Sequence, residues 1–119
     1  MNPEYEIRLY DDNHCQKFLR EEISPELQEI FNYIPDGPIK ADVWRVCILY
    51  RYGGIYVDAD IKPLVPLRDF LDEEDDFVTC ISNVDKPFRK SHLLNPHFIA
   101  TYRGNPVLKK CIERYIDLY

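Results

Sequence analysis

The sequence predicts an α/β domain. Residues 41–52 are helix formers or apolar residues without proline or glycine, which predicts a largely buried helix. Gly53 and Gly54 end it, and the β-branched and aromatic residues 55–57 predict a short strand. Apolar residues at helical spacing over 107–116 predict a further core helix. Helical and strand-forming stretches thus alternate along the chain.

Length and composition narrow the class of protein. At 119 residues we expect one domain spanning 1–119. The net charge of -6 argues against nucleic acid as the main partner, because phosphate backbones select basic surfaces. We expect neither a transmembrane segment nor a signal peptide, since no stretch is long and apolar enough and the start is polar. Four cysteines lack C-x-x-C spacing, so no zinc or redox motif is indicated and a cytoplasmic location is the simpler expectation.

The chain before residue 41 predicts one strand and two helices. Residues 5–10 alternate between apolar and charged side chains, which is typical of a half-buried strand. Asp11 begins a cluster with helix-capping chemistry, for a helix through about Glu22. Ser24, followed by proline, predicts the start of the next helix.

The chain after residue 63 predicts loops, strands and a final helix. The acidic residues 72–76 are interpreted as a solvated loop rather than a metal site. Residues 77–81 predict a strand, and the polar residues 82–91 predict a surface loop, either a plain connection or the border of an acceptor groove. Asn95 begins a further strand, and Asn105 caps the last helix.

Two carboxylates follow the strand at 55–57. Because strand side chains alternate, we expect Asp58 and Asp60 to share one face with Tyr56. Hard oxygen ligands at this spacing suit Mg²⁺ or Mn²⁺, which proteins hold with one or two carboxylates plus substrate phosphates. A polar turn that favours aspartate explains the same pattern, so both interpretations stay open.

A second charged pair lies inside the predicted helix. Asp42 and Arg45 are three residues apart and therefore on one face of it. The pair is either a salt bridge on a solvated face or part of a site that includes the two later aspartates.

The stretch 40–63, which contains D-V-W-R-V-C-I-L-Y-R-Y-G-G-I-Y-V-D-A-D, resembles the sugar-binding DXD region of retaining glycosyltransferases of the GT-A type. The likeness is to family 32, which includes capsular-polysaccharide enzymes and has the pattern D-x-x-R followed by L-Y-x-x-G-G-x-Y-x-D-x-D. Every position of that pattern is filled here. This combination of residue types is far more specific than D-x-D alone.

The resemblance implies a fold and an activity. The fold would be GT-A-like (Rossmann-like), a twisted, mostly parallel sheet flanked by helices, in a truncated or minimal form. The activity would be metal-dependent, retaining transfer of a hexose from a UDP- or GDP-sugar to a saccharide or another hydroxyl acceptor. Retention would come from attack on the same face of the sugar, with the leaving phosphate taking the acceptor's proton. The sequence gives no indication of the oligomeric state.

The resemblance also implies roles for single residues. Asp60 would bind Mn²⁺ or Mg²⁺ directly, and Asp58 would act on the metal through a water molecule and bind ribose or sugar hydroxyls. Asp42 and Arg45 would grip the sugar ring. Asn95 would face the donor sugar, although an Asn-Pro pair also simply initiates turns.

Two other functions remain open from the sequence. The family's opening strand and its closing segment are absent, so the chain is either a shortened member or an incomplete one, and a catalytically incomplete module that binds a nucleotide sugar or metal is the first alternative. The second is an unrelated metal-dependent phosphohydrolase, but such enzymes usually gather more ligands around two ions than this chain offers at ligand spacing.

Overall fold

The computed structural model describes residues 2–86 and 89–119, with side chains described for 2–80 and 95–119. Helices and strands occur together, which confirms the α/β class. In chain order the elements are α1 (Asp12–Phe18), the π-helical turn η1 (Leu19–Ile23), α2 (Pro25–Tyr33), α3 (Gly37–Tyr52), β1 (Gly54–Val57), the 3-10 turn η2 (Leu67–Asp69), β2 (Phe77–Lys86), β3 (Arg89–Thr101) and α4 (Pro106–Leu118).

The helix starts follow local capping chemistry. Side-chain oxygens of Asp11, Ser24 and Asn105 each accept a hydrogen bond from a backbone N–H in the first turn, at 2.8, 3.2 and 2.9 Å. These contacts confirm the three predicted starts, because a cap satisfies a backbone donor that has no partner within the helix. The central helix α3 begins at Gly37, earlier than predicted, and is capped by Asp36.

The strands form an antiparallel sheet in the order β1-β3-β2. Gly54 pairs with Thr101 at one end of β1, and Val57 pairs with Phe98 at the other. The mostly parallel sheet implied by the resemblance is therefore wrong for the described strands. The reason is topological, since β2 and β3 form a hairpin, which joins antiparallel neighbours directly.

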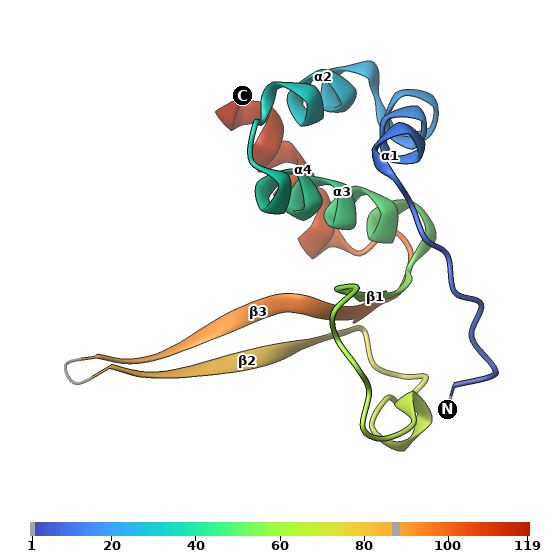
Figure 1. Cartoon of the computed structure of the whole chain (residues 1–119), viewed down its shortest axis with the longest axis vertical. Coiled ribbons are helices and arrows are strands. Elements are labelled where there is room, and N and C mark those ends of the chain that lie inside the picture. The colour runs from blue at the N-terminus through green and yellow to red at the C-terminus, as the bar shows by residue number, and fades with distance from the viewer. Residues whose placement is uncertain (1, 87–88) are drawn as a thin grey trace.

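The β2–β3 hairpin extends beyond the rest of the molecule as a long arm (Figure 1). The predicted strand at 77–81 continues to Lys86, and the predicted surface loop at 82–91 belongs to the hairpin, except for 87–88, which lie outside the described residues. The hairpin partner supplies the backbone hydrogen bonds of this stretch, so it forms a strand without apolar alternation in its sequence.

The helices lie together over one side of the sheet (Figure 1). Their inner faces form the core, in which Leu19, Leu27, Val43 and Cys47 are almost completely buried. Burial raises the pKa of the Cys47 thiol to about 12. No helix among the described residues is long and apolar enough to span a bilayer.

The N-terminal segment differs from its prediction. Residues 5–10 belong to no strand, and all of them except Tyr10 are exposed. The expected half-buried strand is wrong here, because no neighbouring strand of the described chain pairs with this segment. Its start is tied to the region of η2, where the Asn2 side chain accepts a hydrogen bond from the Leu67 N–H at 2.7 Å.

Candidate active site

The candidate site forms where α3 turns into β1, and the turn depends on Gly53. This residue has φ 67° and ψ -169°, a combination that is essentially restricted to glycine, and its N–H bonds the Leu49 carbonyl at 2.7 Å. The predicted glycine break is therefore confirmed. The chain reverses at this point, so β1 lies beneath α3 (Figure 1).

The turn brings Asp58, the first aspartate of the second predicted pair, to Arg45 of the first pair. Its Nη2 lies 2.9 Å from Asp42 Oδ1 and 3.9 Å from Asp58 Oδ1. The Arg45 side chain is only 8% exposed, whereas the two carboxylates are 44% and 35% exposed. The pair on α3 is therefore not a salt bridge on a solvated face. A buried guanidinium holds two carboxylates that solvent, and thus a ligand, can reach.

Three further contacts fix the Arg45 guanidinium. It lies over the Tyr56 ring, with Cζ 4.7 Å from the ring centroid. Its Nη1 donates to the Pro96 carbonyl at 2.6 Å, and its Nε donates to the Ala41 carbonyl at 3.4 Å. The planar guanidinium, with its several N–H donors, suits these contacts better than the ammonium group of a lysine would.

Tyr56 is a site residue that the sequence analysis did not assign. Its hydroxyl donates to Asp58 Oδ1 at 2.7 Å. Burial and then this hydrogen bond raise the pKa of Tyr56 to about 12, so the phenol remains a donor at neutral pH. The alternation along the strand did indicate that Tyr56 shares a face with Asp58, and this was the available signal.

Asp60 lies apart from this cluster. β1 ends at Val57, and a turn follows that is closed by a hydrogen bond from the Ile61 N–H to the Asp58 carbonyl at 3.0 Å. The alternation from which a shared face was predicted therefore does not extend to Asp60. Its side chain is exposed and makes no hydrogen bond or ion pair with the described part of the chain.

Asn95 lies at an irregularity in β3 that adjoins the site. Thr79 pairs with Ile99 while the next residue of β2 pairs with Asn95, so β3 bulges between them. The Asn95 side chain accepts from the His97 N–H at 3.2 Å, and the His97 carbonyl accepts from the Asp58 N–H at 3.0 Å. Bulges of this kind are frequent beside active sites, where they redirect a strand.

Tyr115 of α4 is a partly buried phenol packed against the core. Burial raises the pKa of this phenol, and the charge of Asp42 raises it further, whereas Arg45 lowers it. The sequence analysis assigned this residue to a core stripe with Leu108 and Ile112, which are buried as expected. The electrostatic influence of Asp42 and Arg45 on this phenol follows from the packing of α4 on α3, which the sequence does not show.

The two aspartates of the DXD stretch have the ligand chemistry that a divalent ion prefers. Among the described residues no three histidine, cysteine or acidic side chains converge as a complete ligand set. Mg²⁺ and Mn²⁺ do not need one, because they commonly take one or two carboxylates from the protein and the rest from phosphate and water. Asp58 and Asp60 offer such oxygens, and both are open to solvent.

Comparison with known families decides the assignment. Residues 1–77, well over half of the chain, match the family described as "Glycosyltransferase sugar-binding region containing DXD motif". The chain belongs to this family. Its name fits the stretch in which Asp42, Arg45 and Asp58 converge and which ends in the DXD residues Asp58 and Asp60.

Several proteins that are similar to this chain have names that describe glycosyltransferases. The initiation-specific alpha-1,6-mannosyltransferase of Candida albicans is 23% identical over 98% of this chain and 35% of its own length. Inositol phosphoceramide mannosyltransferase 3 of Schizosaccharomyces pombe is 38% identical over 59% of this chain and 20% of its own length. Lactosylceramide 4-alpha-galactosyltransferase of Pongo pygmaeus is 27% identical over 69% of this chain and 32% of its own length.

The chain thus spans about a third or less of the length of these curated relatives. Comparison with solved structures gives no significant match.

Proposed function

We propose that the chain is the donor-binding part of a metal-dependent, retaining glycosyltransferase that moves a hexose from a nucleotide sugar to a saccharide or another hydroxyl acceptor. One observation carries the proposal, namely that Arg45 contacts both Asp42 and Asp58. Asp42 of the D-x-x-R pair and Asp58 of the D-x-D pair, which are separated in sequence, are thereby held by one guanidinium. Sugar hydroxyls both donate and accept hydrogen bonds, and charge-assisted bonds to carboxylates are the stronger kind.

The role of each residue in donor binding follows from how far solvent reaches its side chain. Asp42 and Asp58 accept hydrogen bonds from donor hydroxyls, since solvent reaches both side chains. Arg45 acts on the donor mainly by orienting these two carboxylates, because its own side chain is buried. Asn95 borders the donor sugar from β3, next to Pro96, whose carbonyl accepts a hydrogen bond from Arg45.

Asp60, with Asp58 beside it, would hold Mn²⁺ or Mg²⁺. The ion supplies charge neutralisation for the departing diphosphate, an effect worth several kcal/mol. Asp60 suits direct binding because it is exposed and has no partner within the described residues. Asp58 would act on the ion through a water molecule, with its carboxylate oriented by Tyr56 and Arg45.

We also propose that residues 1–119 act as one glycosyltransferase-like domain of GT-A type, centred on 40–63. The family match over 1–77 supports this part of the proposal. Two of the relatives are named mannosyltransferases and one a galactosyltransferase. A GDP-mannose donor is therefore the first to test and a UDP-galactose donor the second.

A thermal-shift titration of the chain with these two donors, with and without Mn²⁺, tests the function. We expect one donor to raise the melting temperature only when Mn²⁺ is present, because a ligand of the folded state stabilises it by mass action. In Asp60→Asn we expect the Mn²⁺-dependent shift to be lost while the unliganded melting temperature stays unchanged, since Asp60 is exposed.

Asp69→Asn is the matched control, because it removes an exposed carboxylate from the turn η2 nearby. We expect it to bind as the unaltered chain does. Donor binding that ignores both Mn²⁺ and Asp60 would contradict the proposal. Metal-dependent binding without transfer to any offered acceptor would instead identify the chain as a nucleotide-sugar-binding module.

Tyr56→Phe tests how the Asp58 carboxylate is oriented. We expect the dissociation constant for the donor in Mn²⁺ to rise about fivefold to tenfold, because the variant loses one hydrogen bond to a charged group that solvent partly replaces. Calorimetric titration measures this change. Tyr33→Phe is the control, since Tyr33 is 76% exposed, and equal affinities for the two variants would show that the Tyr56 hydroxyl has no positioning role.

A further inference from the structure

The bulge in β3 supplies backbone groups to the candidate site. Thr79 of β2 pairs with Ile99, whereas the next residue of β2 pairs with Asn95, so the register between the two strands skips residues 96–98. A bulge interrupts the ladder of hydrogen bonds and redirects the strand that contains it. The carbonyls of this stretch are therefore available for contacts outside the β2–β3 ladder.

Two of these carbonyls meet the site. The Pro96 carbonyl accepts from Arg45 Nη1 at 2.6 Å, and the His97 carbonyl accepts from the Asp58 N–H at 3.0 Å. In a regular strand successive carbonyls point to opposite neighbours, so the bulge is what lets two adjacent carbonyls serve the same site.

The Thr79 hydroxyl spans the bulge. Its Oγ1 lies 3.1 Å from the Asn95 carbonyl oxygen and 3.0 Å from the Phe98 carbonyl oxygen. These two carbonyls flank residues 96–97. A threonine hydroxyl has one proton to donate, so the two acceptors share it. One side chain of β2 thus holds both ends of the stretch that reaches the site.

We propose that Thr79 is a positioning residue of the donor site, because its hydroxyl holds the bulge whose two carbonyls reach Arg45 and Asp58. The effect on donor binding rests on the proposed function, whereas the effect on the bulge does not. Thr79 acts from the opposite edge of β3, since β1 and β2 lie on either side of that strand.

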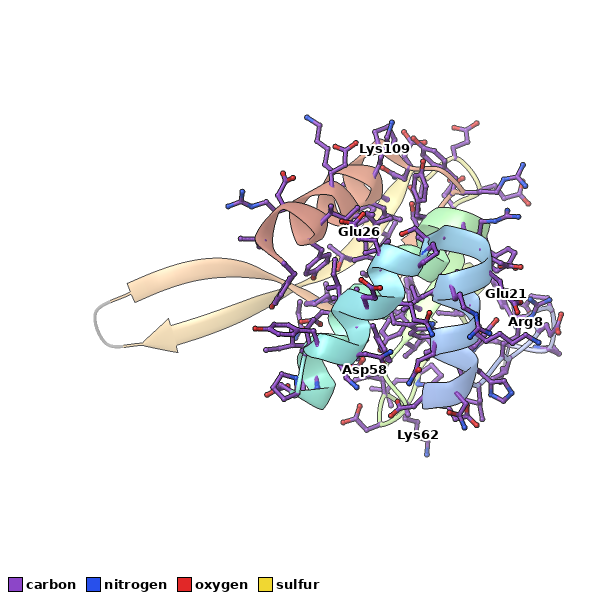
Figure 2. All side chains as sticks on the ribbon, turned by 90° about the horizontal axis from the view of Figure 1, so that it is seen from above. Arg8, Glu21, Glu26, Asp58, Lys62 and Lys109 are labelled. Atoms are coloured by element: carbon purple, nitrogen blue, oxygen red, sulfur yellow. The ribbon has the colours of Figure 1, made fainter. Side chains whose placement is uncertain are left out.

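Thr79 lies at the base of the β2–β3 arm. Ile99 pairs with Thr79 on one side and with Tyr56 on the other, so the three residues form one row across the sheet. Figure 2 shows the arm projecting from one side of the body of the molecule, within whose outline Asp58 lies. The row joins the base of the arm to the strand that leads into Asp58.

Amide hydrogen exchange, measured by NMR without donor, tests the effect on the bulge. Thr79→Val removes the hydroxyl and keeps a β-branched side chain. We expect the Asp58 amide, which bonds the His97 carbonyl, to exchange at least about threefold faster in this variant. The Ile34 amide of α2, which bonds the Ile30 carbonyl, is the internal reference and should not change. Thr79→Ser keeps the hydroxyl and should restore the original rate.

Calorimetric titration in Mn²⁺ tests the effect on binding, with whichever of GDP-mannose and UDP-galactose raises the melting temperature. We expect Thr79→Val to raise the donor dissociation constant by about threefold to tenfold, and Thr79→Ser to stay within about twofold of the unaltered chain. Thr79→Ala also lacks the hydroxyl and should behave as Thr79→Val does.

Thr101→Val is the matched control, because it makes the same change on β3, away from the bulge. The Thr101 hydroxyl also contacts backbone carbonyls, those of Asp76 and Tyr102, each at 3.2 Å. Its loss should lower stability, as the loss of the Thr79 hydroxyl does. We expect it to change neither the exchange rate of the Asp58 amide nor the donor affinity.

An Asp58 amide that exchanges equally in Thr79→Val and the unaltered chain would overturn the inference. So would equal changes in Thr101→Val, which would attribute them to lost stability, or a serine variant that restores nothing. Faster exchange with unchanged donor affinity would remove the positioning role. If the unaltered chain binds neither donor, the proposed function fails, and the exchange rates alone decide whether Thr79 holds the bulge.

Discussion

Replacing Arg45 by methionine is expected to lower the free energy of unfolding by about 2–3 kcal/mol. The guanidinium is buried and joins Asp42, Asp58 and the Pro96 carbonyl, so its loss leaves a carbonyl without a donor and two carboxylates without their counter-charge. The carboxylates are partly exposed and can rehydrate, which keeps the loss below that of a fully buried pair. Methionine can still pack on the Tyr56 ring, so a cavity is not the main effect.

Urea unfolding measures this loss, and donor titration in Mn²⁺ measures its functional counterpart. We expect the donor dissociation constant to rise more than about tenfold, because Arg45 orients both accessible carboxylates. Arg45→Lys should recover only part of each loss, since an ammonium cannot make the same set of contacts. Arg51→Met is the control on the same helix. The Arg51 guanidinium is exposed, and within the described residues it is observed to contact only the Tyr52 ring.

A change in stability within about 0.5 kcal/mol for Arg45→Met, equal to that of a surface substitution, would contradict the account of Arg45 as the centre of the site. Unchanged donor affinity in a folded variant would separate the functional claim from the structural one, and it would remove Arg45 from the proposed donor site.

Replacing Gly53 by alanine is expected to destabilise the chain by about 3 kcal/mol or more. Two costs add at this position. The backbone at φ 67° and ψ -169° is strained for any residue with a Cβ. A Cβ there would also lie 2.6 Å from the backbone N of Arg103, and backbone cannot yield as a flexible side chain can.

The functional effect of Gly53→Ala should follow its structural one. The turn at this residue sets β1 beneath α3, so a displaced turn would separate Asp58 from Arg45. Gly37→Ala is the control, because a Cβ at Gly37 meets no atom within 4 Å and the residue lies in the first turn of α3. Its unfolding free energy in urea should change by less than about 1 kcal/mol. Comparable losses in the two variants would show that the Gly53 turn is not specially constrained.

The sequence predicted those features that depend on contacts between residues only a few positions apart. Caps at Asp11, Ser24 and Asn105 were predictable because a side-chain oxygen bonds an N–H only two or three residues away. The end of α3 at Gly53 was predictable for the same reason. Helical spacing likewise placed Asp42 and Arg45 on one face, and their 2.9 Å contact follows from it.

Features that depend on partners distant in the chain were not predictable in this way. Residues 5–10 alternate as a strand does, yet no described strand lies beside them, whereas the polar stretch after residue 81 is a strand because its hairpin partner supplies the hydrogen bonds. Strand pairing is a contact between segments, so a pattern within one segment cannot specify it. For the same reason, the prediction of a mostly parallel sheet was wrong.

The candidate site also has some features that the sequence predicted and others that depend on packing. Helical spacing predicted that Asp42 and Arg45 share a face, and the resemblance to a sugar-binding region pointed to Asp58 and Asp60, although the strand that was expected to align these two aspartates ends at Val57. The hydrogen bond from Arg45 to the Pro96 carbonyl and the hydrogen bond from the Asp58 N–H to the His97 carbonyl both join elements that only packing brings together. Spacing within a segment therefore set the chemistry of the site, and the packing of α3 and β3 set its geometry.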